Sequence, residues 1–522
     1  MDATMTLICV PIPVHAPEEV PSLLARCARV AECGAGMVEW RIDALFAQPF
    51  DSEGEYEAAL DCIALLIRDS VLPSLVTART VREGGHCELE PEPLFHLLGE
   101  IASLQIPPRF VDVEFAIVEK LGRVPLVREG GASLLFSAHD FQGPPANVAR
   151  LYARMADDDR CAIAKIAWRA RTVRDCHDVF EILALRVKPS VILCMGEEGL
   201  ATRVLAPKFD AFLTFASEGA GLESAPGQPT IAQLKSLYRF DAISRTTKVY
   251  GVIGHPIAHS KSPEFHNTRF AEHSHNGVLL PLLVRGDWES FKAALSMLLD
   301  DKSLSFRGAS VTLPHKEHLV RFVLERGGVV DGTSAWVGAA NTLVVASDGS
   351  LFATNTDVPA GCGVLADALH GAVRNKRIAV FGAGGVARAI AGGLALEGAR
   401  VVIVNRTHEK AVALAEALSQ DGRAVHAMRE DAFECNAMEC ERFDAFVNAT
   451  PLGMDGGPDP DGIAIPDTVH FDSDSVVFDT VYAPRETPLL KLAKSRGART
   501  VGGWEMFLRQ AELQSQLWLS SH

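Results

Sequence analysis

The stretch Arg377–Thr407 restricts the fold of this chain more than any other part of the sequence. It opens with a short apolar run, Arg377–Phe381, of the kind found in buried strands. A turn of the form G-x-G-x-x-A then starts at Gly382, and a helix-like segment leads to a second apolar run, Arg400–Val404. Strand, glycine turn, helix and strand in this order predict a βαβ unit of a doubly wound parallel sheet.

The same unit predicts a dinucleotide site. Its glycines lack the Cβ atoms that would hold the backbone away from a pyrophosphate, and the following helix directs free N–H groups at the same anion. A site for NAD usually has Asp or Glu at the end of the second strand, where it binds the ribose 2′-hydroxyl. Here that strand ends in Asn405, Arg406 and Thr407, and Lys410 follows one helical turn later. Cations suit a 2′-phosphate, so we infer that the cofactor is NADP.

The length and the charge of the chain limit its class. With 522 residues it is too long for one hydrophobic core, so two or three domains are expected. A net charge of −16 argues against nucleic acid or an anionic membrane as a partner, so small molecules are the expected ligands. An anionic substrate would then need locally placed arginine or lysine side chains.

The eleven cysteines are scattered and form no C-x-x-C pair. Free thiols in a reducing cytosol are therefore expected, in preference to disulfides or a metal site. No apolar run is long enough to cross a membrane, and a strand-like segment begins by residue 6, which leaves no room for a signal or transit peptide. The expected location is the cytoplasm.

Residues 1–235 repeat a unit of apolar strand, polar loop and helix-like segment. The strand candidates are Thr6–Pro13, Met37–Asp43, Ser74–Thr80, Arg109–Phe115, Ser133–Asp140, Cys161–Ala167, Val191–Gly196 and Phe209–Ser217. Eight such units in succession predict a (β/α)8 barrel, in which the active site forms at the C-terminal ends of the strands.

Polar side chains lie at the ends of these expected strands, where a barrel would bring them together. Lys165 lies in the apolar run CAIAKIAW, and burial would lower its pKa and leave an amine able to attack a carbonyl. His139 is a proton carrier of suitable pKa, and Glu83 is placed to orient it. Arg203 and the turn Ser224–Gln228 offer donors to a carboxylate. A salt-bridged or snorkelling lysine is the alternative interpretation of Lys165.

The first half resembles the type I 3-dehydroquinate dehydratases along its whole length. The resemblance rests on EWRID, TART followed by EGG, VDVE, SAHDF, AKIA, CMGEEGLATR and SAPGQ, in family order. It implies a (β/α)8 barrel that forms an imine with the substrate ketone and then eliminates water. By motif, Lys165 is the imine lysine, His139 the general acid and base, and Glu83 its partner. The implied substrate-binding residues are Glu39, Arg41, Arg79, Met195, Arg203, Ser224 and Gln228. Trp168, close after the lysine, is bulkier than the family leads one to expect.

In the second half, polar residues again lie on turns. Two serines, Ser260 and Ser262, stand at the start of an expected helix, and one of them is open to interpretation as a helix cap. Lys316 follows a proline turn, Asn341 lies in GAANTL, and Asp357 precedes another helix-like segment. Together they predict a polar cluster with an acid/base pair, although surface turns would explain each residue singly.

The second half is similar to shikimate dehydrogenases along its whole length. The matching motifs are GHPIAHSKSP, VTLPHK, NT in GAANTL, NTD, GAGGVAR, NRT, NATPLGM, VYAP with TPL, and a final Gly-x-x-Met with a later Gln. The similarity implies hydride transfer between NADPH and the C3 carbonyl of 3-dehydroshikimate, with Lys316 and Asp357 as the catalytic pair. The implied substrate-binding residues are Ser260, Ser262, Thr312, Asn341, Tyr482 and Gln510. The implied NADP-binding residues are Gly382, Gly384, Gly385, Val386, Asn405, Arg406, Thr407, Lys410, Thr450 and Gly503.

Two positions depart from the shikimate dehydrogenase pattern. Ser310 stands where the family commonly has asparagine, and Lys410 stands where a second arginine is common. A lysine keeps the positive charge at this position, but it weakens bidentate recognition of a phosphate.

The two resemblances together predict a bifunctional enzyme of the shikimate pathway, similar to the dehydratase–dehydrogenase fusions of plants, because the product of the first step is the substrate of the second. The expected parts are a dehydratase barrel at 1–235, a linker at 236–247, a substrate-binding domain at 248–360, a Rossmann-type NADP-binding domain at 361–488, and a C-terminal helical segment at 489–522 that returns to the substrate domain. The linker lacks the composition of a flexible tether and is expected to be a tight joint. No metal site is expected, and the oligomeric state is left open.

Three alternatives remain at this point. The first is a catabolic quinate/shikimate dehydrogenase fusion that uses NAD, against which Ser260, Ser262 and Arg406 argue. The second is a fusion in which one half only senses a metabolite or NADP. The third is a class I aldolase-type barrel, which shares an imine lysine but does not predict the EWRID and SAPGQ motifs.

Overall fold

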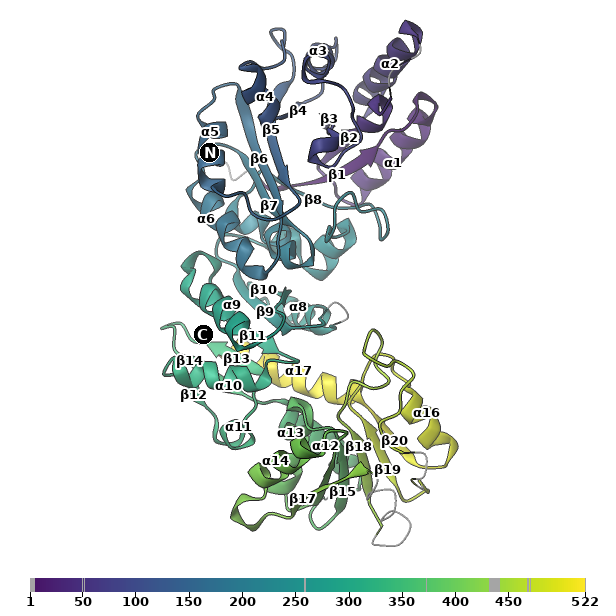
Figure 1. The fold of residues 1–522 in the computed structure, drawn as a ribbon, viewed down its shortest axis with the longest axis vertical. Coiled ribbons are helices and arrows are strands. Elements are labelled where there is room, and N and C mark those ends of the chain that lie inside the picture. The colour runs from purple at the N-terminus through teal and green to yellow at the C-terminus, as the bar shows by residue number, and fades with distance from the viewer. Residues whose placement is uncertain are drawn as a thin grey trace. The chain divides into compact units, whose positions relative to one another are not determined.

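The computed structural model describes residues 5–521 except 49, 51, 258–259, 372, 431–441, 467–468 and 470, and Figure 1 shows its ribbon. Contacts divide the chain into two compact units. The first comprises Met1–Val249, Ala271–Val284 and Ala293–Phe306, and the second comprises Tyr250–Phe270, Arg285–Lys292 and Arg307–His522. No helix within the described residues is both long enough and apolar enough to cross a lipid bilayer.

The first sheet is an eight-stranded parallel barrel. Its strands are β1 (Leu7–Pro13), β2 (Met37–Arg41), β3 (Ser74–Thr77), β4 (Phe110–Glu114), β5 (Ser133–Asp140), β6 (Cys161–Arg169), β7 (Ser190–Met195) and β8 (Leu213–Phe215). They follow one another in chain order, β8 pairs with β1, and a backbone hydrogen bond of 2.8 Å from Phe212 N to Ser190 O brings the start of β8 to β7. The predicted (β/α)8 barrel is confirmed, although β8 is shorter than expected because Ala206–Phe209 forms a 3-10 helix.

Helices surround this barrel, as Figure 1 shows. They are α1 (Val20–Glu32), α2 (Glu53–Asp69), α3 (Pro91–Ala102), α4 (Phe115–Leu121), α5 (Val148–Ala156), α6 (His177–Leu185) and α7 (Leu200–Val204). After β8 the chain forms one π-helical segment, Gln233–Leu237. The linker that follows is held in place, since the buried Lys208 Nζ donates to the carbonyl oxygens of Arg245 at 2.9 Å and Thr247 at 2.8 Å.

Side chains of the barrel strands alternate between the inside of the barrel and the surrounding helices. On β6, Lys165 and Ala167 face inward and line a pocket. Trp168 points the other way and is fully buried outside that pocket. The bulk of Trp168 therefore does not enter the pocket, because the period of two places it on the opposite face of the strand.

The second sheet has six strands in the order β10-β9-β11-β13-β14-β12. Its strands are β9 (Lys248–Gly254), β10 (Gly277–Leu283), β11 (Phe306–Val311), β12 (Val329–Val330), β13 (Thr342–Val345) and β14 (Leu351–Thr354), and β13 runs antiparallel to both β11 and β14. The helices of this region are α8 (Ser262–Glu272), α9 (Trp288–Asp300), α10 (Lys316–Glu325), α11 (Gly332–Val337) and α12 (Asp357–Ala368). Lys316 and Asp357 are therefore the first residues of α10 and α12.

The third sheet is parallel and has the doubly wound order β17-β16-β15-β18-β19-β20. Its strands are β15 (Arg377–Phe381), β16 (Arg400–Val404), β17 (Val425–Met428), β18 (Ala445–Asn448), β19 (Val476–Asp479) and β20 (Arg499–Gly502). Their alternate residues pack on one face against α12, α13 (Gly385–Leu396) and α14 (His408–Leu418), and on the other against α16 (Pro488–Ser495). The order reverses between β15 and β18, which is where such sheets bind their ligands.

The predicted strands Arg377–Phe381 and Arg400–Val404 are confirmed residue for residue. The sheet also includes β20, which pairs with β19 and lies after the range 361–488 expected for the NADP-binding domain. The chain leaves this sheet only in α17 (Gly503–Ser520), which packs against α12 and β13. Hydrophobic periodicity did not distinguish β20 from the helix that follows, because β20 is a short edge strand directly before a long helix.

Candidate active sites

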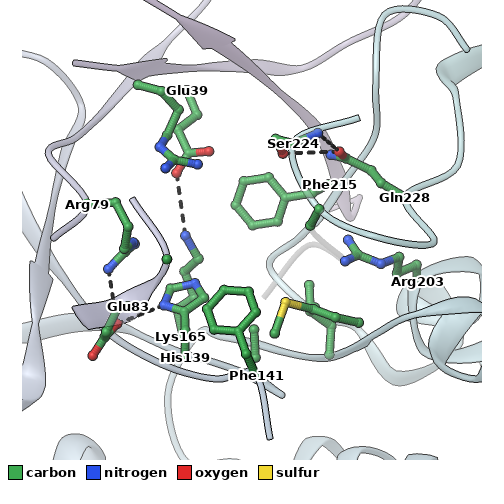
Figure 2. Close-up of a pocket in the computed structure, with 16 residues that line it drawn as sticks. Glu39, Arg79, Glu83, His139, Phe141, Lys165, Arg203, Phe215, Ser224 and Gln228 are labelled. Carbon is green, nitrogen blue, oxygen red and sulfur yellow. Dashed lines mark hydrogen bonds and ion pairs between the residues drawn. The ribbon is translucent and has the colours of Figure 1, made fainter. Parts of the chain in front are cut away.

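A pocket opens inside the barrel at the C-terminal ends of the strands, and Figure 2 shows the side chains around it. The ten residues that the sequence predicted for this site all line it: Glu39, Arg41, Arg79, Glu83, His139, Lys165, Met195, Arg203, Ser224 and Gln228. They come from β2, β5, β6, β7, α7 and the segments after β3 and β8, so a single barrel end collects them.

Lys165 is buried at the floor of this pocket, with 4% of its surface exposed. Its Nζ lies 3.1 Å from Asp112 Oδ2 and 3.4 Å from Glu39 Oε1, and it sits 4.7 Å from the centre of the Phe215 ring. The amine therefore has two carboxylate neighbours as well as apolar ones.

Arg79 joins Asp112 to two further carboxylates, those of Glu83 and Glu114, in one network. Its guanidinium donates to Asp112 Oδ2 at 2.7 Å and Ser137 Oγ at 2.8 Å, and it lies 3.3 Å from both Glu83 and Glu114. Burial alone raises the pKa of Asp112, but the charges of Arg79 and Lys165 outweigh this effect and bring the pKa to about 2. Arg79 thus holds negative charge beside the lysine and is itself neutralised by several partners.

His139 and Glu83 form a second polar pair at the pocket wall, with His139 Nδ1 2.9 Å from Glu83 Oε2. Burial raises the pKa of Glu83, and the carboxylates of Glu114 and Asp112 add to this effect. Burial also lowers the pKa of His139 well below its usual value, and the cations Arg79 and Lys165 act in the same direction. The pair therefore carries a neutral imidazole at neutral pH, with Nδ1 engaged and Nε2 left to exchange a proton.

On the side of the pocket formed by α7 and the loop after β8, the polar groups lack partners. Arg203 is 2% exposed, its Nε has no hydrogen-bond partner in the described part of the chain, and burial lowers its pKa to about 10. Ser224 N and Oγ both donate to Gln228 Oε1, at 2.8 and 3.0 Å, which leaves the buried Gln228 Nε2 without an acceptor among the described residues. A buried cation and a buried amide donor without acceptors are a ready site for a carboxylate.

The second cluster of predicted residues lies where α10 and α12 begin. Lys316 Nζ is 2.5 Å from Asp357 Oδ2, and both residues are buried, at 8% and 5% exposure. A Cβ atom on Gly385 would lie 3.1 Å from the Lys316 side chain. The glycine turn after β15 is therefore in contact with the stem of this lysine, which joins the cofactor turn to the acid/base pair.

Asn341 lies beside this pair. Its Nδ2 donates to Thr356 Oγ1 at 3.0 Å and to Gln510 Oε1 at 3.3 Å, and its Oδ1 accepts from Thr356 N at 2.9 Å. Burial raises the pKa of the Tyr482 hydroxyl, and a hydrogen bond with Ser260 acts on this pKa in the opposite direction. The predicted substrate-binding residues thus form two hydrogen-bonded groups, one around Asn341 and Gln510 and one around Ser260 and Tyr482.

Three predicted positions complete this view. Ser262 is buried as the first residue of α8, with its N–H 3.3 Å from Ser260 Oγ, and Thr312 follows β11 directly. Gly503 starts α17 against backbone, since a Cβ there would lie 2.3 Å from Thr480 O. The structure thus explains why Gly503 is a glycine, whereas its cofactor role stays a prediction.

The turn after β15 has the shape that a dinucleotide needs. Gly382 has φ +117°, and a Cβ atom on it would lie 2.8 Å from Ala449 O, so only glycine fits. Above Gly384 a Cβ atom would meet nothing, which leaves open space at the N-terminus of α13. Thr450 N and Oγ1 both donate to Asn448 Oδ1, at 2.9 and 2.7 Å, and these bonds hold Thr450 beside the glycine turn.

The residues after β16 lie at the surface. Arg406, Thr407 and Lys410 are exposed, and Asn405 Nδ2 donates to Thr407 O at 2.9 Å, which holds the turn closed. Two exposed cations near the N-terminus of α14 fit a phosphate on the adenosine ribose.

Comparison with known proteins identifies the family of both halves. A family model for type I 3-dehydroquinase matches residues 8–245, one for the shikimate dehydrogenase substrate binding domain matches 252–343, and one for shikimate/quinate 5-dehydrogenase matches 364–440. A chloroplastic bifunctional 3-dehydroquinate dehydratase/shikimate dehydrogenase of Arabidopsis thaliana is 34% identical over 98% of this chain and 82% of the relative. The chain belongs to this bifunctional family.

Other relatives match the dehydrogenase half. A shikimate dehydrogenase (NADP(+)) of Ignicoccus hospitalis is 37% identical over 52% of this chain and 94% of the relative. A crystal structure of a shikimate dehydrogenase in complex with NADP+ is 33% identical and covers 52% of this chain and 90% of its own, with a TM-score of 0.45.

Some neighbours of the dehydratase lysine were not assigned roles from the sequence. Asp112 makes the shorter of the two carboxylate contacts with Lys165, and Phe215 and Phe141 line the same pocket. The sequence signal for Asp112 was its position in VDVE, where the alternation of the strand places its side chain inside the barrel. In the dehydrogenase half Thr356 was missed, and its position directly before Asp357 was the only sequence signal.

Proposed function

We propose that this chain dehydrates 3-dehydroquinate to 3-dehydroshikimate in its barrel and reduces 3-dehydroshikimate to shikimate with NADPH in its C-terminal half, the two activities of its family. The observation that carries the proposal is the barrel pocket, in which Lys165 lies between two carboxylates. The same pocket holds Arg203, whose Nε has no hydrogen-bond partner among the described residues. One group suits a ketone and the other suits a carboxylate, so the pocket fits a keto acid.

In the dehydratase site we assign the imine to Lys165. Its ammonium gives up a proton, and the resulting amine attacks the ketone carbon. The ketone oxygen then leaves as water, with that proton and a second one from the nitrogen, as the C=N bond forms. The protonated imine accepts electron density, so the adjacent C–H becomes acidic and His139 Nε2 removes that proton. The C–O bond to the β-hydroxyl then breaks, the same imidazole returns the proton to the departing oxygen as water, and a second water hydrolyses the imine.

Arg203 is proposed to bind the substrate carboxylate, with Gln228 and Ser224 as further donors. Replacing Arg203 with methionine is expected to raise the KM for 3-dehydroquinate about 100-fold, the size of losing charged hydrogen bonds. It should also raise the unfolding temperature, because an unpaired buried charge is removed. Steady-state kinetics and thermal unfolding measure the two effects. The exposed Arg174 is the control, and an unchanged KM in Arg203→Met would remove Arg203 from substrate binding.

In the dehydrogenase site the glycine turn and the cations after β16 fit NADP. When bound, the cofactor supplies or accepts a hydride. The residues proposed to hold it are Gly382, Gly384, Gly385, Val386, Asn405, Arg406, Thr407, Lys410, Thr450 and Gly503. Lys316 is proposed to donate a proton to the C3 oxygen as the hydride arrives, and Asp357 holds and orients the ammonium through its contact of 2.5 Å. Ser260, Ser262, Thr312, Asn341, Tyr482 and Gln510 are proposed to bind the ring hydroxyls and carboxylate.

The 2′-phosphate role of Arg406 gives a sharp prediction. Arg406→Ala is expected to weaken NADPH binding about 10-fold or more, the size of a charge-assisted hydrogen bond, and to leave NADH binding almost unchanged. Fluorescence titration of both cofactors measures this. Arg400→Ala, at the other end of β16 and also exposed, is the matched control. An equal loss for NADPH and NADH would refute the role.

The proposal as a whole is tested by supplying the pure chain with 3-dehydroquinate and NADPH and assaying shikimate. Appearance of shikimate with consumption of NADPH is the expected result, and failure of either step would overturn the proposal. Parallel assays with NADH and with quinate test the catabolic alternative, in which NAD and quinate would be preferred. A cytoplasmic location belongs to the same proposal and is tested by cell fractionation.

A further inference from the structure

A buried carboxylate lies at the C-terminal edge of the third sheet, beside the point where the strand order reverses. Asp479, the last residue of β19, has no exposed surface and is paired in the parallel ladder with Asn448, the last residue of β18. Two residues earlier on these strands, Phe446 and Val477 pack on the face that α16 covers. The period of two directs Asn448 and Asp479 to the same face, toward the start of α16.

Three hydrogen-bond donors surround the Asp479 carboxylate. Its Oδ2 accepts from Thr487 Oγ1 at 2.6 Å, and its Oδ1 accepts from Asn448 Nδ2 at 2.9 Å and from Val481 N at 3.0 Å. Thr487 caps α16 by accepting from Leu490 N at 3.3 Å, so its one hydroxyl hydrogen is left for Asp479. A carboxylate has no donor of its own and therefore matches all three of these groups.

The charge of Asp479 is held by these hydrogen bonds, since it has no ion-pair partner in the described part of the chain. Burial raises its pKa to about 6, although the three hydrogen bonds act in the opposite direction. Because this pKa lies above that of an exposed aspartate, the ionised form destabilises the folded chain at every pH above about 6. A neutral side chain would avoid this cost, so a carboxylate here indicates a role other than stabilising the fold.

The bond from Asn448 carries the effect of Asp479 to the cofactor turn. Asn448 Nδ2 faces Asp479, with Leu452 O at 3.3 Å as its other acceptor, and this leaves Asn448 Oδ1 for the two donors of Thr450. Thr450 in turn touches the glycine turn, because a Cβ atom on Gly382 would lie 3.2 Å from its Cγ2. A reversed Asn448 amide would place its donors against those of Thr450 and its oxygen against the carboxylate.

We propose that Asp479 is a positioning residue of the NADP site, which fixes the orientation of the Asn448 amide and thereby holds Thr450 beside the glycine turn. The inference rests on the proposed function, because that function assigns Thr450 to the cofactor. Asp479 contacts neither the cofactor nor the substrate in this scheme and acts on cofactor binding through Asn448.

The test uses the full chain and measures NADP+ binding by titration calorimetry, which requires no turnover. Asp479→Ala removes the acceptors, Asp479→Leu removes them and fills the space, and Asp479→Asn keeps an acceptor for Asn448. Asn448→Ala, alone and combined with Asp479→Ala, completes a double-mutant cycle. Asp444→Ala changes a partly exposed aspartate directly before β18, at the opposite edge of the same sheet, and is the control.

At pH 8, where Asp479 is ionised, Asp479→Ala and Asp479→Leu are each expected to weaken NADP+ binding about 10-fold, the size of one buried hydrogen bond. The kcat at saturating NADPH should stay almost unchanged, which a general loss of structure would not permit. Asp479→Asn and Asp444→Ala should bind NADP+ almost as the unchanged chain does. In the Asn448→Ala background, Asp479→Ala should cause no further loss, because its effect passes through that amide.

Normal NADP+ binding in Asp479→Leu would overturn the inference, and so would an equal loss in Asp479→Asn. Additive losses in the double variant would show that Asp479 does not act through Asn448 and would also overturn it. An unchanged chain that binds NADP+ but does not reduce 3-dehydroshikimate would overturn the proposed function alone, whereas one that does not bind NADP+ would overturn both.

Discussion

Replacing Lys165 with alanine is expected to lower the kcat for dehydration of 3-dehydroquinate by more than about 10³-fold, as the loss of other covalent nucleophiles does. The reason is that no other amine lines the pocket in the described structure, so the ketone cannot be converted into an imine. Incubation with 3-dehydroquinate and borohydride should add the mass of reduced ligand to the unchanged chain and none to the variant. Dehydrogenase activity should survive, because its site is built from other elements.

A buried lysine elsewhere in the barrel is the control for this experiment. Lys208 is also buried, but its ammonium is used by the carbonyl oxygens of Arg245 and Thr247. Lys208→Ala should lower the unfolding temperature and still permit borohydride trapping. Trapping that persists in Lys165→Ala, or loss of both enzymatic activities in a folded variant, would contradict an imine at Lys165 and independent sites.

Replacing Lys316 with alanine is expected to reduce the kcat for 3-dehydroshikimate by about 10²- to 10⁴-fold, the usual contribution of a positioned acid or base. Without the ammonium, the C3 oxygen has no proton donor as negative charge develops on it. Asp357→Asn should act in the same direction, because a neutral amide does not pair with the lysine ammonium as the carboxylate does across their contact of 2.5 Å. Steady-state kinetics at saturating NADPH, with dehydratase activity as the standard for folded protein, measures both variants.

The control is another lysine–aspartate pair in the same unit. Lys376 Nζ lies 2.8 Å from Asp444 Oδ1, and this pair is partly exposed. Lys376→Ala should leave kcat unchanged, because such surface pairs contribute little. A rate close to that of the unchanged chain in Lys316→Ala would remove this lysine from the mechanism.

Local chemistry explains what could be predicted. The strands Arg377–Phe381 and Arg400–Val404 and the turn at Gly382 are set by neighbouring residues, because apolar runs, glycine and helix starts act over a few positions. The eight barrel strands follow from the same signals. The ten pocket residues could be named because the resemblance to the dehydratases implies them, and they meet because the C-terminal ends of barrel strands converge.

Pairing between distant side chains could not be derived in this way. The second carboxylate beside Lys165, and the lack of a partner for Arg203 Nε among the described residues, depend on which strands lie side by side and how each loop returns. Gln514 reaches Asn341 across 173 positions of the chain. The sequence by itself determined the elements and the side chains that carry the chemistry, since these follow from short-range periodicity. Only the tertiary structure decided which charges are neutralised and which are left for a substrate, because electrostatic pairing depends on distance in space.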